Sequence, residues 1–178
     1  MILSCYIPNI QIIEYIIPAL RLVAVIHIRK ATRDDIKTII HHRIEMIRSM
    51  GWSEDMISAT ETATHKFLQE PWDPSIECYL ATYGEQVIGG CAVSFCIAYP
   101  SARNPSGRFA YLYNMFVEPE YRGRGIATSL VRHITQLCRE RGIEKMTLND
   151  TKMSKGIYEK EGFVRSENYY TKIISECD

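Results

Sequence analysis

The residues best suited to chemistry lie in one stretch, Val117-Glu118-Pro119-Glu120-Tyr121-Arg122-Gly123-Arg124-Gly125-Ile126-Ala127-Thr128. The pattern predicts that a strand ends here, that a glycine-rich turn follows and that a helix begins at about Gly125. Such a turn directs consecutive backbone N–H groups into one concavity, and the helix N-terminus adds partial positive charge. Glycine lets the backbone approach a ligand closely because no Cβ intervenes. The turn is therefore a candidate site for a pyrophosphate group.

The distribution of charge favours the same turn. The 178-residue chain carries 21 Lys+Arg and 21 Asp+Glu, and this balance disfavours a basic nucleic-acid coat protein. From Arg122 to Lys145, however, there are six basic and two acidic residues, a local charge of +4. The simpler interpretation is a tight turn followed by a solvated basic helix face, since a glycine motif alone is only a hypothesis.

Two other nucleotide-binding patterns compete for these glycines. A Walker A loop requires G-x-x-x-x-G-K-[ST], which the chain lacks. A dinucleotide fingerprint requires G-x-G-x-x-G near the start of a large doubly wound sheet. Thr128 stands at the third glycine position and only 50 residues follow it, so a full dinucleotide-binding fold does not fit.

The flanking segments predict the elements that must position the turn. Apolar alternation predicts strands and apolar residues at helical spacing predict helices. Expected strands are 26–31, 77–83, 86–98, 108–117, 143–148 and a final pair within 162–174, and expected helices are 32–50, 54–68, 125–141 and 152–160. The strand–helix–strand unit over 108–148 should be a right-handed crossover between parallel strands.

Two motifs in this framework resemble those of a known family. Arg122, Gly125 and Ala127 meet the pattern Arg/Gln-x-x-Gly-x-Gly/Ala, which is motif A of the GNAT superfamily of acetyl-CoA-dependent N-acetyltransferases. Downstream, Gly156-Ile157-Tyr158-Glu159-Lys160-Glu161-Gly162-Phe163 resembles motif B, whose core is a Tyr four residues before Gly-Phe. The resemblance covers residues 26–178 and implies an α/β (α+β) fold with a mixed, mostly antiparallel central sheet flanked by helices.

The resemblance also implies roles for individual residues. The strand end would pair with the pantetheine arm of acetyl-CoA, the turn would hold the pyrophosphate, and Asn149 would contact the cofactor arm in place of the Asn that the family often has where Thr151 stands. The cofactor-binding set is Met115, Phe116, Val117, Arg122, Gly123, Arg124, Gly125, Ile126, Ala127, Thr128 and Asn149. Tyr158 would be the general acid that protonates the departing thiolate. The alternative for Tyr158 is an aromatic residue that packs the last helix on the sheet.

The general base does not transfer by motif. Many relatives use a carboxylate near the strand before motif A, but the best-matching position holds Tyr111. Glu118 is the first candidate and Asp150 the second, and each is otherwise a solvated surface carboxylate. His41 and His42 are expected to be a surface pair rather than a metal site, because adjacent helix residues face different directions. No metal is expected.

The implied reaction transfers an acetyl group from acetyl-CoA to a primary amine of a small molecule. The alternatives are a peptide or protein N-acetyltransferase, or a coenzyme A-binding sensor without catalysis. The loop at 99–107 and the turn at 49–53 are expected to flank the acceptor pocket, with Trp52, Tyr99 and Arg103 as candidate contacts. Asn114 is a candidate for orienting the substrate.

Residues 1–25 form an apolar N-terminal extension outside the resemblance. The longest uncharged run, Met1 to Ile13, is shorter than the ~20 residues of a membrane-spanning helix. We expect an extra strand or helix that packs on the domain or across a homodimer, with a membrane-surface anchor as the alternative. Six cysteines without a CxxC pair indicate free thiols in a reducing cytoplasm.

Overall fold

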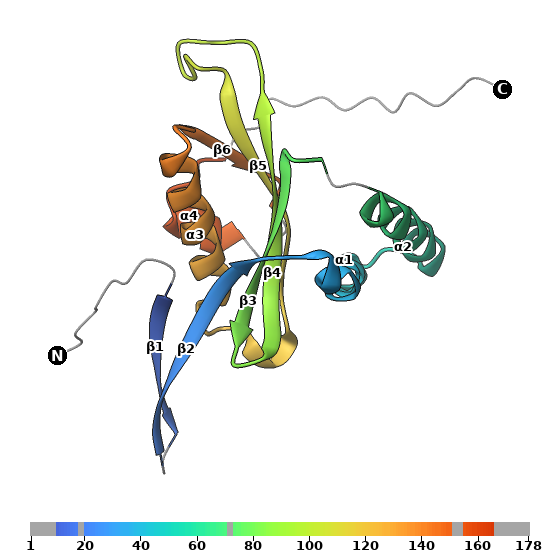
Figure 1. Cartoon of the computed structure of the whole chain (residues 1–178), viewed down its shortest axis with the longest axis vertical. Coiled ribbons are helices and arrows are strands. Elements are labelled where there is room, and N and C mark those ends of the chain that lie inside the picture. Colours follow the sequence, from blue (N-terminus) through green and yellow to red (C-terminus); the bar gives the residue numbers. More distant parts are fainter. Residues whose placement is uncertain (1–9, 18–19, 71–72, 151–154, 166–178) are drawn as a thin grey trace.

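The computed structural model describes residues 10–17, 20–70, 73–150 and 155–165. Its centre is a six-stranded sheet in which the strands follow chain order (Figure 1). The strands are β1 (Ile10–Ile17), β2 (Leu20–Lys30), β3 (Ile76–Tyr83), β4 (Gln86–Ile97), β5 (Arg108–Val117) and β6 (Lys145–Leu148). Neighbours from β1 to β5 pair antiparallel, and β5 pairs parallel with β6. The expected mixed, mostly antiparallel sheet is confirmed.

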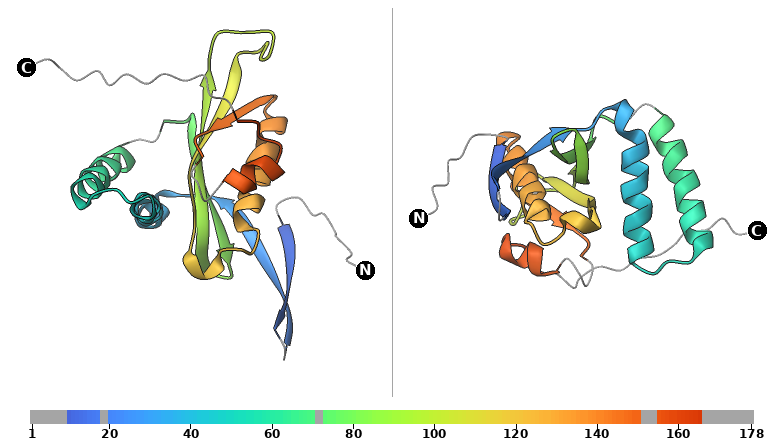
Figure 2. Two further views of the ribbon diagram at one scale, coloured as in Figure 1. Left: turned by 180° about the vertical axis from the view of Figure 1, so that it is seen from behind. Right: turned by 90° about the horizontal axis from the view of Figure 1, so that it is seen from below.

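Helices cover both faces of this sheet. Helices α1 (Ile36–Ser49) and α2 (Glu54–Gln69) lie on one face, and α3 (Ile126–Glu140) and α4 (Lys155–Lys160) lie on the other (Figure 2). Short 3₁₀ turns, Arg33–Asp35 and Pro119–Tyr121, precede α1 and follow β5. Because α3 connects β5 to the parallel strand β6, the expected crossover is confirmed.

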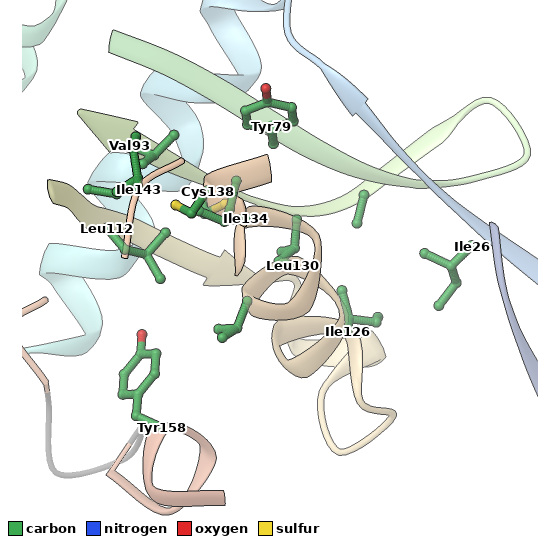
Figure 3. Packing of buried hydrophobic residues seen from close by; sticks show 14 of the residues in the cluster. Ile26, Tyr79, Val93, Leu112, Ile126, Leu130, Ile134, Cys138, Ile143 and Tyr158 are labelled. Atoms are coloured by element: carbon green, nitrogen blue, oxygen red, sulfur yellow. The ribbon is translucent and has the colours of Figure 1, made fainter. Parts of the chain in front are cut away.

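Each face has its own hydrophobic core. The face under α3 buries residues of β3, β4, β5 and α3, including Leu130, Val131 and Ile134 at 0% exposure. Figure 3 shows side chains of α3 packed beside the sheet, with Tyr158 of α4 below them. The face under α1 buries Ile39, Ile40, Ile44 and Ile47 against Leu80 and Ala92 of the sheet. The isoleucines recur at helical spacing, so α1 presents one apolar side to the strands.

Most element boundaries agree with the sequence expectations. The strand at 108–117 is confirmed to the residue, and α2 extends the helix expected at 54–68 by one residue. Strand β2 begins at Leu20 and runs unbroken to Lys30, so it crosses the expected boundary between residues 25 and 26. The part of the last helix at 152–154 and most of the final strand pair, 166–174, lie outside the described residues.

The N-terminal segment contributes a strand to the sheet, which is one of the two elements, strand or helix, expected for it. β1 and β2 form an antiparallel hairpin from Ile10↔His27 to Ile17↔Leu20, which places β1 at one edge of the sheet. Within the described ranges, no helix has the length and apolar character needed to cross a membrane.

Three cysteines are buried free thiols, as expected. Cys78, Cys91 and Cys138 lie in the cores, and burial raises the pKa of the Cys78 thiol to about 11. A thiol in this state stays protonated and unreactive at neutral pH. Cys5 and Cys177 lie outside the described residues.

Candidate functional site

The second half of β5 has an open edge. Pairing with β6 runs from Phe109↔Lys145 to Leu112↔Leu148, where β6 ends, while β5 continues to Val117. Among the described residues, no strand pairs with 113–117 on this side. The Glu118 N–H donates to the Ile88 carbonyl of β4 at 3.0 Å. Since backbone groups alternate in direction along a strand, those of Met115 and Val117 face the open edge. The Val117 carbonyl accepts from the Arg122 side chain, and the groups of Met115 and the Val117 N–H can pair with an extended ligand.

A β-bulge shapes this edge. Ala92 lies opposite Tyr113 and Gly90 lies opposite Phe116, so Asn114 and Met115 together face one residue of β4. Asn114 has φ +54°, in the left-handed region that Asn tolerates better than most residues. The extra residue changes the side-chain alternation, because Tyr113 packs in the core under α1 whereas Met115 packs against the core under α3.

The turn after β5 forms an open backbone cradle. Gly123 and Gly125 have φ +74° and +78°, and a Cβ at either position would meet no atom within 4 Å. The first intrahelical bond of α3 runs from the Ser129 N–H to the Gly125 carbonyl at 2.9 Å. The N–H groups of 126–128 find no acceptor within the described part of the chain, as expected at a helix start. A cradle of exposed N–H groups at a helix N-terminus fits the pyrophosphate of coenzyme A.

Arginines surround the cradle. The Arg122 Nε donates to the Val117 carbonyl at 2.9 Å, which ties the turn to the end of β5. Its guanidinium lies 5.6 Å from the centroid of the Phe116 ring, and that of Arg124 lies 5.3 Å from the centroid of the Tyr121 ring. These guanidinium groups add positive charge beside the N–H groups of the turn.

Tyr158 lies in the core on the α3 face with 7% exposure. Its ring makes an edge contact with Phe163, with centroids 5.6 Å apart. Figure 3 shows the hydroxyl directed towards Leu112, the residue at which the pairing of β5 with β6 ends. The ring therefore packs the last helix on the sheet, and the same orientation aims its phenol at the start of the open edge.

Two histidines of α1 meet Glu118 at the end of β5. The Glu118 Oε1 lies 3.1 Å from the Nε2 of His41 and 3.5 Å from the Nε2 of His42. The side chain of Glu118 is 21% exposed, and those of the histidines are 52% and 2% exposed. The expectation of a surface pair is wrong for His42, because the side of α1 that carries it packs against Phe116, with ring centroids 5.0 Å apart.

Burial and the neighbouring His41 lower the pKa of His42 to about 4, so this ring is neutral at pH 7. Its Nε2 makes no hydrogen bond within the described residues. The described part of the chain contains no group of three or more side chains placed to hold a metal ion. The cluster therefore offers a carboxylate and a neutral imidazole for proton transfer.

Other sequence candidates lie further out. Asn149 and Asp150 are exposed directly after β6, and Thr151 lies outside the described residues. Tyr99, 97% exposed, lies in the loop that joins β4 to β5, at the opposite end of β5 from Glu118 (Figure 1). The expectation that this loop, with Arg103, flanks the acceptor pocket stays a prediction.

A cavity of about 490 Å³, which the sequence did not indicate, lies between α1, α2 and the sheet. Its lining includes Arg43 from α1, Asn114 from the bulge and a side of α2, whereas Trp52 does not line it. The signal that could have indicated it is the spacing of Ala59, Ala63 and Phe67, which share one face of α2. The remaining lining residues are Ile39, Thr60, Thr64, Leu68, Ile76, Cys78, Ala92 and Tyr113.

Comparison with known proteins agrees with this geometry. Residues 44–163 match the family model described as acetyltransferase (GNAT) family. The chain is 25% identical over 130 residues to thialysine N-epsilon-acetyltransferase of Bos taurus, covering 70% of this chain and 74% of that protein. It is 32% identical over 100 residues to N-acetyltransferase 8B of Rattus norvegicus, covering 54% of this chain and 43% of that protein.

Solved structures show the same fold. A predicted acetyltransferase of Clostridium acetobutylicum, crystallised with acetyl-CoA, superimposes with a TM-score of 0.71 at 26% identity, covering 83% of this chain and 96% of that one. A GCN5-related N-acetyltransferase of Ralstonia eutropha JMP134 gives a TM-score of 0.76 at 23% identity, covering 83% and 98%. Because the family model spans more than half of the chain and the fold agrees, the protein belongs to the GNAT family of acetyl-CoA-dependent acetyltransferases.

Proposed function

We propose that this protein transfers the acetyl group of acetyl-CoA to a primary amine of a small molecule by direct attack. The observation that carries the proposal is the open edge of β5, which leads into a glycine cradle at the start of α3. An extended thioester arm and an anionic pyrophosphate need these two features side by side. Acetyl-CoA supplies the activated acyl group, and the residues of the chain bind, orient and move protons.

Backbone groups would do most of the binding. The N–H groups of 123–128 would hold the pyrophosphate, with the guanidinium of Arg122 beside them and the α3 dipole favouring its negative charge, whereas the Arg122 N–H already donates to the Pro119 carbonyl. Met115, Phe116 and Val117 would align the pantetheine arm as an added strand, and Asn149 would contact it from beyond the end of β6. An arm paired with the open edge of β5 would place its thioester near the bulge formed by Asn114 and Met115.

Proton transfer requires a base and an acid. Glu118 would accept the proton of the attacking amine, directly or through water, since its carboxylate is partly exposed and contacts two imidazoles. The ring of His42, neutral at pH 7, lies beside this carboxylate, with Nε2 3.5 Å from Oε1. Tyr158 would protonate the thiolate of coenzyme A as it leaves.

The size of the cavity between α1, α2 and the sheet favours a small-molecule acceptor over a protein. Its volume of about 490 Å³ lies in the range of small-molecule sites, ~300–1,000 Å³. It lies between α1, α2 and the sheet and is lined by a residue of the bulge, so its occupant would be close to the reacting thioester. The contact of Glu118 with two histidines favours catalysis over a coenzyme A-binding sensor.

Turnover tests the reaction. Release of coenzyme A, measured by thiol titration, is followed with a panel of amines and peptides. Tyr158→Phe should lower kcat by roughly 10²- to 10⁴-fold, the usual contribution of a general acid, while acetyl-CoA affinity in calorimetry stays the same. Unchanged turnover would remove the acid role, and acetyl-CoA binding without acetylation of any amine would favour the sensor.

The binding site is tested independently at the cradle. Gly125→Glu places a side chain at φ +78° and a negative charge beside the expected pyrophosphate, so it should abolish acetyl-CoA binding. Gly142→Glu is the matched control, because Gly142 has φ +62°, open space and a place at the other end of α3. Binding that survives Gly125→Glu, or that Gly142→Glu removes equally, would contradict the placement of the site.

A further inference from the structure

We propose that the cavity between α1, α2 and the sheet selects an acceptor amine that carries both a bulky apolar group and a carboxylate. This inference rests on the proposed function, since it names the class of amine. Two features of the cavity support it: an apolar wall and one cation without a counterion.

The wall formed by α2 is apolar and uncovered. Only Ile57 and Leu68 of this helix are buried. Ala59, Ala63 and Phe67 line the cavity at positions four residues apart, and Phe67 is 49% exposed despite its size. An apolar surface of this kind gains free energy when a ligand removes it from water. The apolar part of the acceptor would therefore lie along α2.

Arg43 supplies the charge. It is the one charged side chain among the residues that line the cavity, and it is half-buried. Within the described residues it makes no hydrogen bond or ion pair, whereas Arg48 of the same helix pairs with Glu45. A partly desolvated cation is costly without a counterion, and the planar guanidinium suits a carboxylate in a two-bonded pair. The acceptor would supply the missing carboxylate.

Asn114 places the cavity beside the bulge, because it is one of the lining residues. Its Oδ1 is buried and is not open to the cavity. Other polar groups of the lining are already engaged, since Thr60 and Thr64 donate to helix carbonyls and the Tyr113 hydroxyl accepts from Ser94. The acceptor would therefore bind through its carboxylate and its apolar part, with its amine directed towards the bulge, where β5 would meet the thioester arm.

The experiment compares phenylalanine, phenylalaninamide and glycinamide as acceptors in wild type and two cavity variants. Arg43→Gln removes the charge and should lower kcat/KM for phenylalanine roughly 10- to 100-fold, the worth of a hydrogen bond to a charged group, with little change for the amide. Ala63→Trp fills the apolar wall and should lower kcat/KM at least tenfold for both phenylalanine compounds while sparing glycinamide. Acetyl-CoA affinity should stay unchanged in both variants.

Matched controls use neighbouring residues outside this cavity. Arg48→Gln removes another α1 arginine, and Thr62→Trp adds the same bulk to an exposed position beside Ala63. Both controls should retain wild-type selectivity. Calorimetry with N-acetylphenylalanine and its amide, in the presence of coenzyme A, measures the same preference without turnover.

The outcomes separate the two proposals. An equal loss for phenylalanine and its amide in Arg43→Gln, or no loss in Ala63→Trp, overturns this inference while acetylation of amines upholds the function. Carboxylate-dependent binding of the product analogue without acetylation of any amine upholds the cavity and overturns the function. A dimer that Ala63→Trp dissociates would show that a second copy of the chain covers α2, which also overturns the inference.

Discussion

Protonation of His42 should make the fold less stable in mildly acidic solution. Burial, together with the neighbouring His41, lowers the pKa of His42 from 6.5 to about 4, and the side chain is 2% exposed. The unfolded chain binds the proton near pH 6.5, whereas the folded chain resists it until about pH 4. The contribution of neutral His42 to the unfolding free energy is therefore fully present above pH 6.5 and is lost between pH 6.5 and pH 4. Below pH 4 this residue causes no further change.

The size of the effect follows from the shift. One pKa unit corresponds to about 1.4 kcal/mol, so the change from 6.5 to about 4 amounts to about 3 kcal/mol of unfolding free energy. This is a large share of the ~5–15 kcal/mol typical of a domain. The groups that face the ring are Glu118, at 3.5 Å, and His41, and both remain in the variant described next.

Urea unfolding at pH values from 7.5 to 4 provides the assay. His42→Gln keeps a polar side chain but does not titrate, so its unfolding free energy should change by about 3 kcal/mol less than that of wild type across this range. His65→Gln, at an exposed position of α2, is the control and should follow the wild-type curve. Parallel curves for wild type and His42→Gln would refute the conclusion that His42 is held neutral by burial.

Two further predictions concern stability. The hydrogen bond from Arg29 holds the pKa of Asp35 at about 2. Wild type should therefore lose about 1–2 kcal/mol of unfolding free energy as pH falls from 3.8 towards 2, and Asp35→Asn should not show this loss in thermal unfolding. Leu130→Ala should lower the unfolding free energy by ~2–5 kcal/mol in urea titrations, because Leu130 is fully buried between α3 and the sheet. A loss below 1 kcal/mol at Leu130 would contradict the packing described for α3.

Local patterns were enough to predict the elements that carry the cofactor site. The pattern from Val117 to Thr128 predicted the end of β5, a glycine-rich turn and the start of α3, and in the structure both Gly123 and Gly125 have positive φ. These features depend on residues adjacent in sequence, so one sequence suffices to recognise them. The beginning of β2 was harder, because the apolar run before Ile26 does not alternate and gives no strand signal.

Features that depend on distant segments could not be predicted in this way. The burial of His42 follows from the packing of α1 on Phe116, more than 70 residues later in the chain. The cavity exists because α2 buries only two of its residues, which helical spacing alone does not reveal.

The bulge at Asn114 explains why one strand serves two sites. Without the extra residue, side chains would alternate strictly from Tyr113, and Phe116 would face α3 instead of packing on His42. With it, Phe116 turns towards α1, while Met115 and Val117 keep their backbone groups on the open edge. The same residue lines the cavity between α1, α2 and the sheet. The bulge thus brings the acceptor cavity, the proposed base Glu118 and the edge for the thioester arm to a single stretch of five residues.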